Sequence, residues 1–251
     1  MFDWLKRTFA GNAGPVPGDA RFLGVDMHAH WLPGLDDGAK TMDDSLEMIE
    51  AMVHMGYRKL IATPHIMADL YRNTPQIIDE RLAEVKAACI RENIPVVLEA
   101  AAEYLIDDGF EEHLRQYGAL RIAERHILVE FGFFQPPPNI EAIFFRLQAD
   151  RLRPILAHPE RYTYYHQQVE RLRAFADRGV LLQLNLLSLS GTYGERVRRA
   201  AGKLLDDKLI TFLGTDAHHI DHVHKLTTLL TQPAVAPLNA TTFANHQLTT
   251  A

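Results

Sequence analysis

Short apolar runs alternate with longer amphipathic segments through most of the chain, from residue 22 to residue 216. The short runs are rich in Val, Ile and Leu, and their length favours strands over helices. The longer segments place apolar residues three or four positions apart, which predicts helices with one buried face. The predicted strands are residues 22–25, 59–63, 95–101, 126–130, 153–157, 180–185 and 209–214. The predicted helices are residues 44–56, 77–93, 110–117, 140–149, 166–178 and 195–206, with Asp43 or Asp44 capping the first.

The regular order of strand and helix predicts parallel strands with helices packed outside them. Seven such units fit a chain of this length better as a closed barrel than as an open doubly wound sheet. No Gly-x-Gly-x-x-Gly turn follows the first strand, which also argues against a dinucleotide-binding sheet. The pattern therefore predicts an α/β fold, a (β/α)7 barrel.

On this pattern the chain divides into an extension with a linker, a barrel domain and a C-terminal tail, at residues 1–21, 22–235 and 236–251. In the extension, Phe2, Leu5 and Phe9 have the spacing of a short amphipathic helix, and residues 11–18 form a linker rich in glycine and proline. We expect this helix to pack against its own protein rather than on a membrane, because only two basic residues accompany it.

Composition narrows the class of protein. With 47% hydrophobic and 23% charged residues, the chain has the make-up of a globular protein with a sizeable core. Its net charge of −6 provides no basic surface for nucleic acid or anionic membranes, so neither is expected as a partner. The single cysteine, Cys89, excludes an intramolecular disulfide and fits a reducing compartment. No apolar run approaches the roughly 20 residues of a transmembrane segment, and residues 1–10 lack the core of a signal peptide. We therefore expect a cytoplasmic protein.

The first sign of chemistry lies at the end of the first strand. His28 and His30 are separated by one residue, and on an extended backbone their side chains project to the same face. Asp36 and Asp37 follow in a loop punctuated by proline and glycine. Two co-facing imidazoles followed by carboxylates could begin a metal site, although a single His-x-His is also common without one.

Further ionisable residues follow the ends of the other strands. In a parallel barrel these ends meet on one face, where active sites are built. A histidine at one strand end is more often a hydrogen-bonding residue than a ligand, but that explanation does not account for the coincidence across six strands. Five imidazoles and four carboxylates are too many for one ion and suit three divalent ions, with Mn, Fe or Zn as candidates. The candidate ligands are His28, His30, Asp37, His65, Glu103, Glu130, His158, Asp216 and His218.

Several of these candidates lie within longer motifs. The motifs are His28-Ala29-His30, Leu32-Pro33-Gly34-Leu35-Asp36-Asp37-Gly38-Ala39, Thr63-Pro64-His65, Ala101-Ala102-Glu103-Tyr104, Leu128-Val129-Glu130-Phe131, His158-Pro159-Glu160-Arg161-Tyr162 and Gly214-Thr215-Asp216-Ala217-His218. Together they resemble PHP-domain proteins (polymerase and histidinol phosphatase). More narrowly, they resemble the manganese-dependent bacterial protein-tyrosine phosphatases of the CpsB/YwqE type. The resemblance covers residues 22–235 in the same order.

This resemblance implies a distorted, TIM-like (β/α)7 barrel of the PHP fold. Its trinuclear metal site, with Mn as the expected metal, would lie at the C-terminal face of the strands. By position, the ligands would divide into His28 and His30 for one ion, Asp37, His65 and His218 for a second, and Glu130 and His158 for a third, with Glu103 and Asp216 as bridges. Arg161 would contact the substrate phosphate, since a guanidinium offers two parallel donors to phosphate oxygens. The alternative for Arg161 is a surface salt bridge with Glu160.

The implied reaction is hydrolysis of a phosphotyrosine. Divalent ions lower the pKa of a bridging water, so metal-bound hydroxide is available as the nucleophile near neutral pH. The ions and Arg161 would stabilise charge on the phosphoryl group. A phenolate, with a pKa of about 10, leaves without strong help from a general acid. The thiol mechanism of other tyrosine phosphatases is excluded, because Cys89 lies within a predicted helix without a phosphate-binding loop.

Two regions beside the expected site leave alternatives open. Residues 131–138 are aromatic and contain three prolines, so they could form a wall for a phosphotyrosine ring or a loop that caps the barrel. The family also has a basic residue soon after its last Asp-x-His motif, and here no arginine follows. His222, His224 or Lys225 could replace it, or these residues could simply begin a helix.

Three functions are considered. The favoured one is a phosphatase for a bacterial tyrosine kinase that controls capsule or exopolysaccharide synthesis. The second is a PHP phosphoesterase for a small metabolite such as histidinol phosphate, and the closeness of the motifs to the tyrosine-phosphatase branch argues against it. The third is a PHP module kept for binding, which the presence of all nine candidate ligands disfavours. The resemblance is also compatible with a homo-oligomer.

Overall fold

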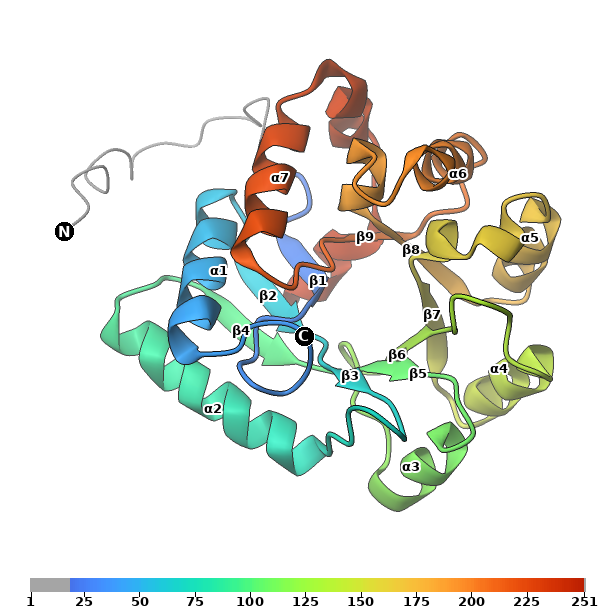
Figure 1. Cartoon of the computed structure of the whole chain (residues 1–251), viewed down its shortest axis with the longest axis horizontal. Coiled ribbons are helices and arrows are strands. Elements are labelled where there is room, and N and C mark those ends of the chain that lie inside the picture. The colour runs from blue at the N-terminus through green and yellow to red at the C-terminus, as the bar shows by residue number, and fades with distance from the viewer. Residues whose placement is uncertain (1–18, 251) are drawn as a thin grey trace.

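The apolar runs of the sequence form the parallel strands of a central barrel, and the amphipathic segments form the helices around it (Figure 1). The computed structural model describes residues 19–250, so the predicted N-terminal helix and its linker lie outside the described residues. The strands are β1 Val25–Ala29, β2 Lys59–Ala62, β3 His65–Ile66, β4 Val97–Ala100, β5 Glu103–Leu105, β6 His126–Glu130, β7 Arg153–Ala157, β8 Leu181–Asn185 and β9 Phe212–Gly214. The helices are α1 Met42–His54, α2 Pro75–Arg91, α3 Phe110–Tyr117, α4 Ile140–Ala149, α5 Val169–Asp177, α6 Glu195–Asp206 and α7 Ile220–Leu230.

The strands follow one another around the barrel in chain order, and every neighbouring pair is parallel. β2 and β3 are two halves of one interrupted strand, and so are β4 and β5. Backbone hydrogen bonds continue across the interruption, from Ala101 N to Ala62 O at 2.8 Å and from Glu103 N to Pro64 O at 3.1 Å. These interruptions separate a three-stranded from a six-stranded segment and are one source of the distortion of the barrel.

The last strand returns to the first. His30 N donates to Ala217 O at 2.9 Å, and Asp216 N donates to His28 O at 2.7 Å. Ala29 and Ala217 form an isolated parallel bridge at the same place. Seven strands, with the two interrupted ones counted once each, therefore form the predicted α/β barrel. Three of the four residues in these two hydrogen bonds are candidate metal ligands.

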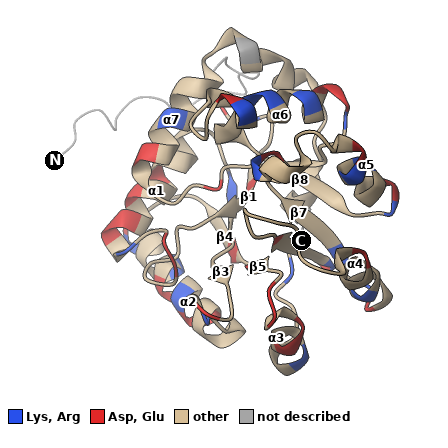
Figure 2. Ribbon diagram, turned by 45° about the vertical axis from the view of Figure 1, so that its right-hand side comes forward, with Lys and Arg blue, Asp and Glu red and all other residues tan. Residues whose placement is uncertain are grey.

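The outer helices carry charged residues of both signs on the rim of the molecule (Figure 2). α1 shows how the sequence sets a boundary: Thr41 accepts a hydrogen bond from Asp44 N through its side chain, and Asp44 in turn accepts from Thr41 N. This capping box stabilises the first turn. The prediction that Asp43 or Asp44 is the cap was therefore wrong by a few residues, because Asp44 acts from the third helical position.

Several other boundaries differ from the prediction, and three of them illustrate the reasons. β1 begins at Val25, because a turn that ends at Gly24 with φ 69° precedes it. α5 begins at Val169 instead of His166, because two 3-10 helices, η1 Pro159–Arg161 and η2 Thr163–Tyr165, occupy the preceding loop. β9 is shorter than predicted and begins at Phe212. Apolar residues at these ends pack without extended pairing, so periodicity alone misplaces the boundary.

Alternation along the strands builds two apolar layers. Outward-facing residues such as Ile127, Leu156 and Leu182 belong to the main core with the helices. Their neighbours Leu128 and Ile155 belong to a smaller cluster inside the barrel. Since the inner cluster lies toward the start of the strands, the opposite end is left for polar side chains.

The C-terminal residues cover the N-terminal end of the barrel. The 3-10 helix η5, Ala244–Thr250, contributes Leu248 to the inner cluster. Buried Asn245 donates to Val25 O at 3.0 Å and to Leu213 O at 2.7 Å, and it accepts from Leu213 N at 3.0 Å. Lys59 Nζ donates to Leu248 O at 2.7 Å. The domain limits at residues 21 and 235 stay predictions, while these contacts tie residues 244–250 to β1, β2 and β9.

No helix within residues 19–250 combines the length and the apolar composition that crossing a membrane requires.

We predict that Asn245→Leu lowers the free energy of unfolding by at least about 2 kcal/mol, because it leaves buried backbone groups of Leu213 and Val25 without partners. Urea denaturation followed by circular dichroism measures the change. Gln247→Leu, at an exposed position two residues away, is the matched control and should change the unfolding free energy little. Equal stability of the two variants would contradict the structural role of Asn245.

Candidate metal centre

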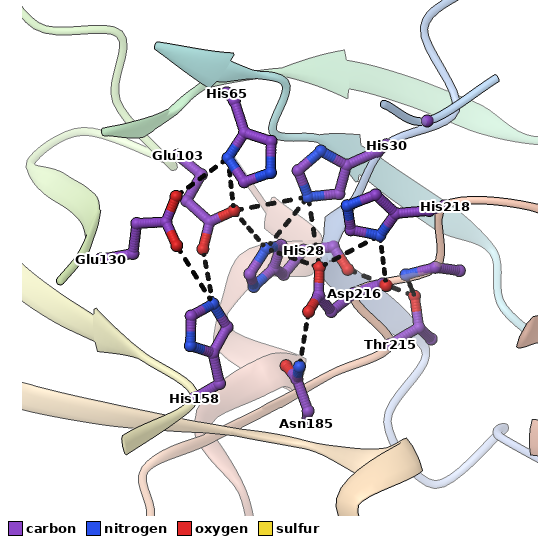
Figure 3. A network of polar contacts seen from close by, with 12 residues as sticks. His28, His30, His65, Glu103, Glu130, His158, Asn185, Thr215, Asp216 and His218 are labelled. Atoms are coloured by element: carbon purple, nitrogen blue, oxygen red, sulfur yellow. Dashed lines mark hydrogen bonds and ion pairs between the residues drawn. The ribbon is translucent and has the colours of Figure 1, made fainter. Parts of the chain in front are cut away.

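The candidate ligands converge at the C-terminal ends of the strands, and Figure 3 labels eight of the nine. These eight lie within β1, β3, β5, β6, β7 and β9 or up to four residues beyond them, and Asp37 lies in the loop after β1. Six of the nine are buried to 3% exposure or less, whereas His218 is partly exposed and the Asp37 side chain is 56% exposed. The nine candidate ligands therefore form a largely buried polar cluster that reaches solvent at Asp37 and His218, and we name this cluster the pit. The six are His28, His30, Glu103, Glu130, His158 and Asp216.

The most buried group consists of His28, His30, Glu103 and Asp216. His28 Nε2 lies 3.1 Å from Glu103 Oε2 and 3.3 Å from Asp216 Oδ1. His30 Nε2 lies 3.4 Å and 3.3 Å from the same two oxygens. The two imidazole nitrogens are 3.3 Å apart and face each other. Four donor atoms thus surround one point.

Two further groups share members with the first. Asp37 Oδ1 lies 3.5 Å from His65 Nε2 and 3.4 Å from His218 Nε2, and His30 completes this group. On the other side of the ring, His65 Nδ1 lies 3.0 Å from Glu130 Oε1 and 3.2 Å from Glu103 Oε2. His65 therefore stands between two groups, one at each ring nitrogen.

His158 lies beside the third group. Its Nε2 is 2.8 Å from Glu103 Oε1 and 3.8 Å from Glu130 Oε2. The grouping implied by the sequence, with Glu130 and His158 together and Glu103 as a bridge, is compatible with these distances.

The donor set can be tested for its fit to cations. Glu103 Oε2, Glu130 Oε1 and Asp216 Oδ1 are buried and make no hydrogen bond within residues 19–250, although imidazole nitrogens lie close to each. Such orphaned acceptors are costly unless a positive charge faces them. Imidazole and carboxylate donors in this arrangement suit divalent ions such as Mn, Fe and Zn. The residues present therefore fit a divalent metal cluster.

The electrostatics of the pit agree with this fit. Burial alone would lower the pKa of His28, but the carboxylates of Glu103 and Asp216 raise it to about 9. Burial alone would raise the pKa of Glu103, but His28 and His65 hold it well below its usual range. The pKa of Asp216 is likewise held low, against burial, by His28 and His218. The carboxylates stay ionised and require positive charge beside them, which bound cations would supply.

A buried chain of amides orients His28. Gln183 Nε2 donates to Asn185 Oδ1 at 3.0 Å, and Asn185 Nδ2 donates to Asp216 Oδ2 at 2.6 Å. Gln183 Oε1 therefore faces His28 Nδ1, at 2.8 Å, and accepts a hydrogen bond from its N–H. In the neutral imidazole, the form that binds a metal, this leaves the lone pair on Nε2, the nitrogen that faces Glu103 and Asp216.

Two buried aspartates hold the neighbouring backbone. Asp36 pairs with His30 Nδ1 at 2.7 Å and accepts from His65 N at 3.0 Å, so it orients two candidate ligands. Asp26 accepts from Thr215 N at 2.9 Å and from the Thr215 hydroxyl at 2.7 Å. Burial raises the pKa of Asp26 to about 7. Each aspartate links two strand ends that carry candidate ligands.

The backbone is strained at two of the candidate ligands. His158 has φ 35° and Asp216 has φ 50°, both in the left-handed region. Such conformations cost of order 1–3 kcal/mol each and cluster at functional sites. Close packing adds a constraint at Gly214, where a Cβ would lie 2.7 Å from Gln183 Nε2 and 2.9 Å from His28 Cβ. Only glycine fits beside the amide chain.

Arg161 lies at the edge of the pit. Its Nη1 donates to Asp216 Oδ2 at 3.1 Å, and its side chain is 23% exposed. The alternative salt bridge with Glu160 is wrong, because Glu160 is buried and accepts from Ser188 Oγ at 2.7 Å and from Asn185 N at 3.0 Å.

The aromatic loop at residues 131–138 borders the pit, as the sequence predicted. The Phe133 ring stacks beside His158 with a centroid separation of 6.0 Å and is 43% exposed. Phe131 is buried against Tyr162 and Phe144 and belongs to the main core outside the barrel. The ring-binding role and the capping role of this loop both stay predictions.

The residues after the last Asp-x-His motif form the start of α7. His222 Nδ1 accepts from His218 N at 3.3 Å, so it supports a candidate ligand. His224 and Lys225 are exposed.

Several residues in or beside the pit were not identified from the sequence. Gln183 and Asn185 alternate with leucines on β8, and two polar residues on one face of an apolar strand are a signal that could have identified them. Asp26, inside the first strand, gives the same signal. Tyr193, which lies over Arg161, occupies a loop of serine, threonine and glycine where no periodicity marks it.

Comparison with known proteins agrees with the geometry. The family model for capsular polysaccharide synthesis, CpsB/CapC, matches residues 24–227. The tyrosine-protein phosphatase YwqE of Bacillus subtilis is 33% identical over 197 residues, which is 78% of each chain. The putative tyrosine-protein phosphatase CapC of Staphylococcus aureus is 30% identical over 197 residues, 78% of this chain and 77% of its own.

Solved structures show the same relationship. The chain matches a structure from a study of YwqE from Bacillus subtilis and CpsB from Streptococcus pneumoniae, described as metal-dependent tyrosine phosphatases. The TM-score is 0.77 at 31% identity, over 86% of this chain and 90% of the other. A lactonase from Listeria monocytogenes, at 14% identity and a TM-score of 0.53, shares the fold over 92% of each chain. The chain belongs to the CpsB/CapC family of capsular polysaccharide synthesis.

Proposed function

We propose that this protein is a metal-dependent protein-tyrosine phosphatase. The observation that carries the proposal is the convergence of nine imidazole and carboxylate side chains in one pit at the barrel mouth. Relatives at 30–33% identity are named tyrosine-protein phosphatases. Cys89 is buried in α2 and its pKa is raised by burial, so it does not offer the thiolate of the cysteine-dependent alternative.

The proposed site holds three divalent ions, with Mn as the expected metal and Fe or Zn as alternatives. His28 and His30 would hold the first, Asp37, His65 and His218 the second, and Glu130 and His158 the third, with Glu103 and Asp216 as bridges. The shared positions of Glu103 and Asp216 within hydrogen-bond distance of several imidazoles support this division. When bound, such ions lower the pKa of water and neutralise phosphoryl oxygens.

The protein's own groups bind and orient the phosphate ester. Arg161 is proposed to bind phosphate oxygens through the N–H groups that its one hydrogen bond within residues 19–250, to Asp216, leaves free. The exposed part of Phe133, beside His158, is proposed to receive the phosphotyrosine ring. The amide chain through Gln183 keeps the proton of His28 on Nδ1, away from the pit.

The proposed substrate is a phosphotyrosine protein, a bacterial tyrosine kinase that controls capsule or exopolysaccharide synthesis, and the expected location is the cytoplasm. The capsular family supports this substrate class. A homo-oligomer stays compatible with the resemblance. Histidinol phosphate hydrolysis and a purely binding role are the alternatives.

The first prediction concerns substrate class. With Mn supplied, the protein should hydrolyse a phosphotyrosine peptide with a kcat/KM at least about tenfold above that for histidinol phosphate, because the aromatic edge of the pit fits a phenyl ring. Phosphate release from each substrate, measured after metal removal and again after Mn addition, gives both kcat/KM values and their dependence on Mn. Turnover of histidinol phosphate alone would contradict the proposal, and failure on both substrates would favour a binding module.

The second prediction concerns the ligands. His28→Ala should reduce Mn-dependent turnover by at least about a thousandfold, because it removes a donor from the most buried group. Circular dichroism should show that the barrel still folds. His54→Ala, at an exposed position on α1, is the matched control. Metal-dependent turnover retained in His28→Ala would refute the assignment of the site.

A third prediction tests the amide chain. Gln183→Leu should weaken Mn binding about 10–100-fold, because His28 loses the acceptor that fixes its proton on Nδ1. Isothermal titration calorimetry on the metal-free protein measures the affinity. Gln116→Leu, exposed on α3, should bind Mn like the unmodified protein. An unchanged Mn affinity in Gln183→Leu would show that the amide chain does not affect metal binding by His28.

A further inference from the structure

The guanidinium of Arg161 lies against two aromatic rings from two different loops at the barrel mouth. The Arg161 Cζ atom lies 4.6 Å from the centroid of the Phe133 ring and 4.4 Å from the centroid of the Tyr193 ring. Phe133 belongs to the loop after β6, and Tyr193 to the turn between the 3-10 helix η3, Leu186–Ser190, and α6. Both distances are within the range of a favourable cation–π contact. We name Phe133 and Tyr193 the aromatic clamp.

The aromatic clamp acts on a side chain that has little else to hold it. Within residues 19–250, the one hydrogen bond of the Arg161 side chain goes from Nη1 to Asp216 Oδ2. A guanidinium has five N–H donors and a long flexible stem. Cation–π contacts restrict the side chain without using its N–H groups as hydrogen-bond donors, and these donors point outward in the plane of the guanidinium. The remaining edge therefore stays free for an incoming anion.

The segment that carries Tyr193 is fixed to the segment that carries Arg161. Buried Glu160, the neighbour of Arg161, accepts from Ser188 Oγ at 2.7 Å, and Ser188 lies in η3. Gly191 and Gly194 flank the turn with φ 83° and 94°, and Gly194 N donates to Gly191 O at 2.8 Å. The ring of Tyr193 is thus presented to Arg161 by a tight, anchored turn.

The ring of Tyr193, rather than its hydroxyl, makes this contact. Among the described residues the hydroxyl has no hydrogen-bond partner. Burial raises the pKa of Tyr193, so the phenol stays neutral and its face remains an attractive partner for a cation. Phenylalanine should therefore replace tyrosine here with little loss, whereas an aliphatic residue should not.

We propose that Phe133 and Tyr193 are positioning residues that fix the Arg161 guanidinium for the phosphate of the substrate. The proposal rests on the phosphate-binding role proposed above for Arg161. Neither ring needs to touch the reacting atoms, since both act through the guanidinium.

The test is a double-mutant cycle on the full-length, Mn-loaded protein. The variants are Tyr193→Leu, Tyr193→Phe, Arg161→Gln and the double variant Tyr193→Leu with Arg161→Gln. The readouts are KM for p-nitrophenyl phosphate and the inhibition constant of inorganic phosphate, because both ligands lack peptide contacts. Thermal melting and bound Mn are measured for every variant. Tyr117→Leu, at a half-exposed tyrosine on α3, is the matched control.

Tyr193→Leu should raise the phosphate inhibition constant about threefold to tenfold, with Mn content and melting temperature close to those of the unmodified protein. Tyr193→Phe should retain most of the phosphate affinity. In the Arg161→Gln background, Tyr193→Leu should have no further effect, since the ring has lost the group that it positions.

The possible failures are distinguishable. The aromatic clamp would be overturned, and the role of Arg161 left intact, by one combination of results. In it, phosphate inhibits Tyr193→Leu as strongly as the unmodified protein but inhibits Arg161→Gln only weakly. Additive effects in the double variant would also overturn it, because they would mean that Tyr193 acts independently of Arg161. Unchanged phosphate inhibition in Arg161→Gln would refute the phosphate role itself and the clamp with it.

Discussion

Several buried carboxylates lie beside one another at the mouth of the barrel, and their charge must be balanced for the structure to be stable. Glu103, Glu130 and Asp216 lie almost wholly out of solvent within a few ångströms of shared imidazoles. Desolvation of a carboxylate is costly, and His28 and His65 offset it for Glu103 only if they carry charge. Divalent cations would supply that charge while leaving the imidazoles neutral, as ligation requires. The residues of the pit therefore fit a cation site.

The barrel meets this constraint by dividing its interior. Apolar residues such as Leu128 and Ile155 fill the half near the start of the strands, and η5 closes that end. The other half is left to ionisable side chains. The hydrogen bonds between β1 and β9 close the ring at His28 and Asp216, so the same contacts that complete the fold also set the spacing of the site. The stability of the barrel and the geometry of the site therefore both depend on the contacts between β1 and β9.

A second set of polar groups holds the candidate ligands in place. Asp36 fixes His30 and the backbone of His65, and Gln183 with Asn185 fixes His28 relative to Asp216. Around Arg161, aromatic rings instead of hydrogen bonds hold the side chain in place. A guanidinium that binds an anion needs its N–H donors free for that anion. In both arrangements the supporting groups hold a side chain without occupying the atoms that would bind the metal or the phosphate.

Most of the fold and the set of candidate ligands could be predicted from the sequence. The C-terminal ends of the strands in a parallel barrel converge regardless of the conformation of the loops. The positions of His65, Glu103 and Glu130 after apolar runs were sufficient to bring them together. Strand limits near Val25 and Phe212 were less predictable, since buried turns and strands share the same apolar composition.

The amide chain and the aromatic clamp depend on which segments face each other across the barrel mouth. Nothing local to Asn185 or Tyr193 specifies that Asp216 or Arg161 is its partner. Their contacts arise from long-range packing, which periodicity does not describe.

Anomalous X-ray diffraction from crystals of the Mn-loaded protein, measured on both sides of the Mn absorption edge, tests the proposed metal site directly. We expect three anomalous peaks, each within about 2.5 Å of imidazole nitrogens and carboxylate oxygens of the nine candidate ligands. Peaks elsewhere on the surface, with none among His28, Glu103 and Asp216, would contradict the proposed site.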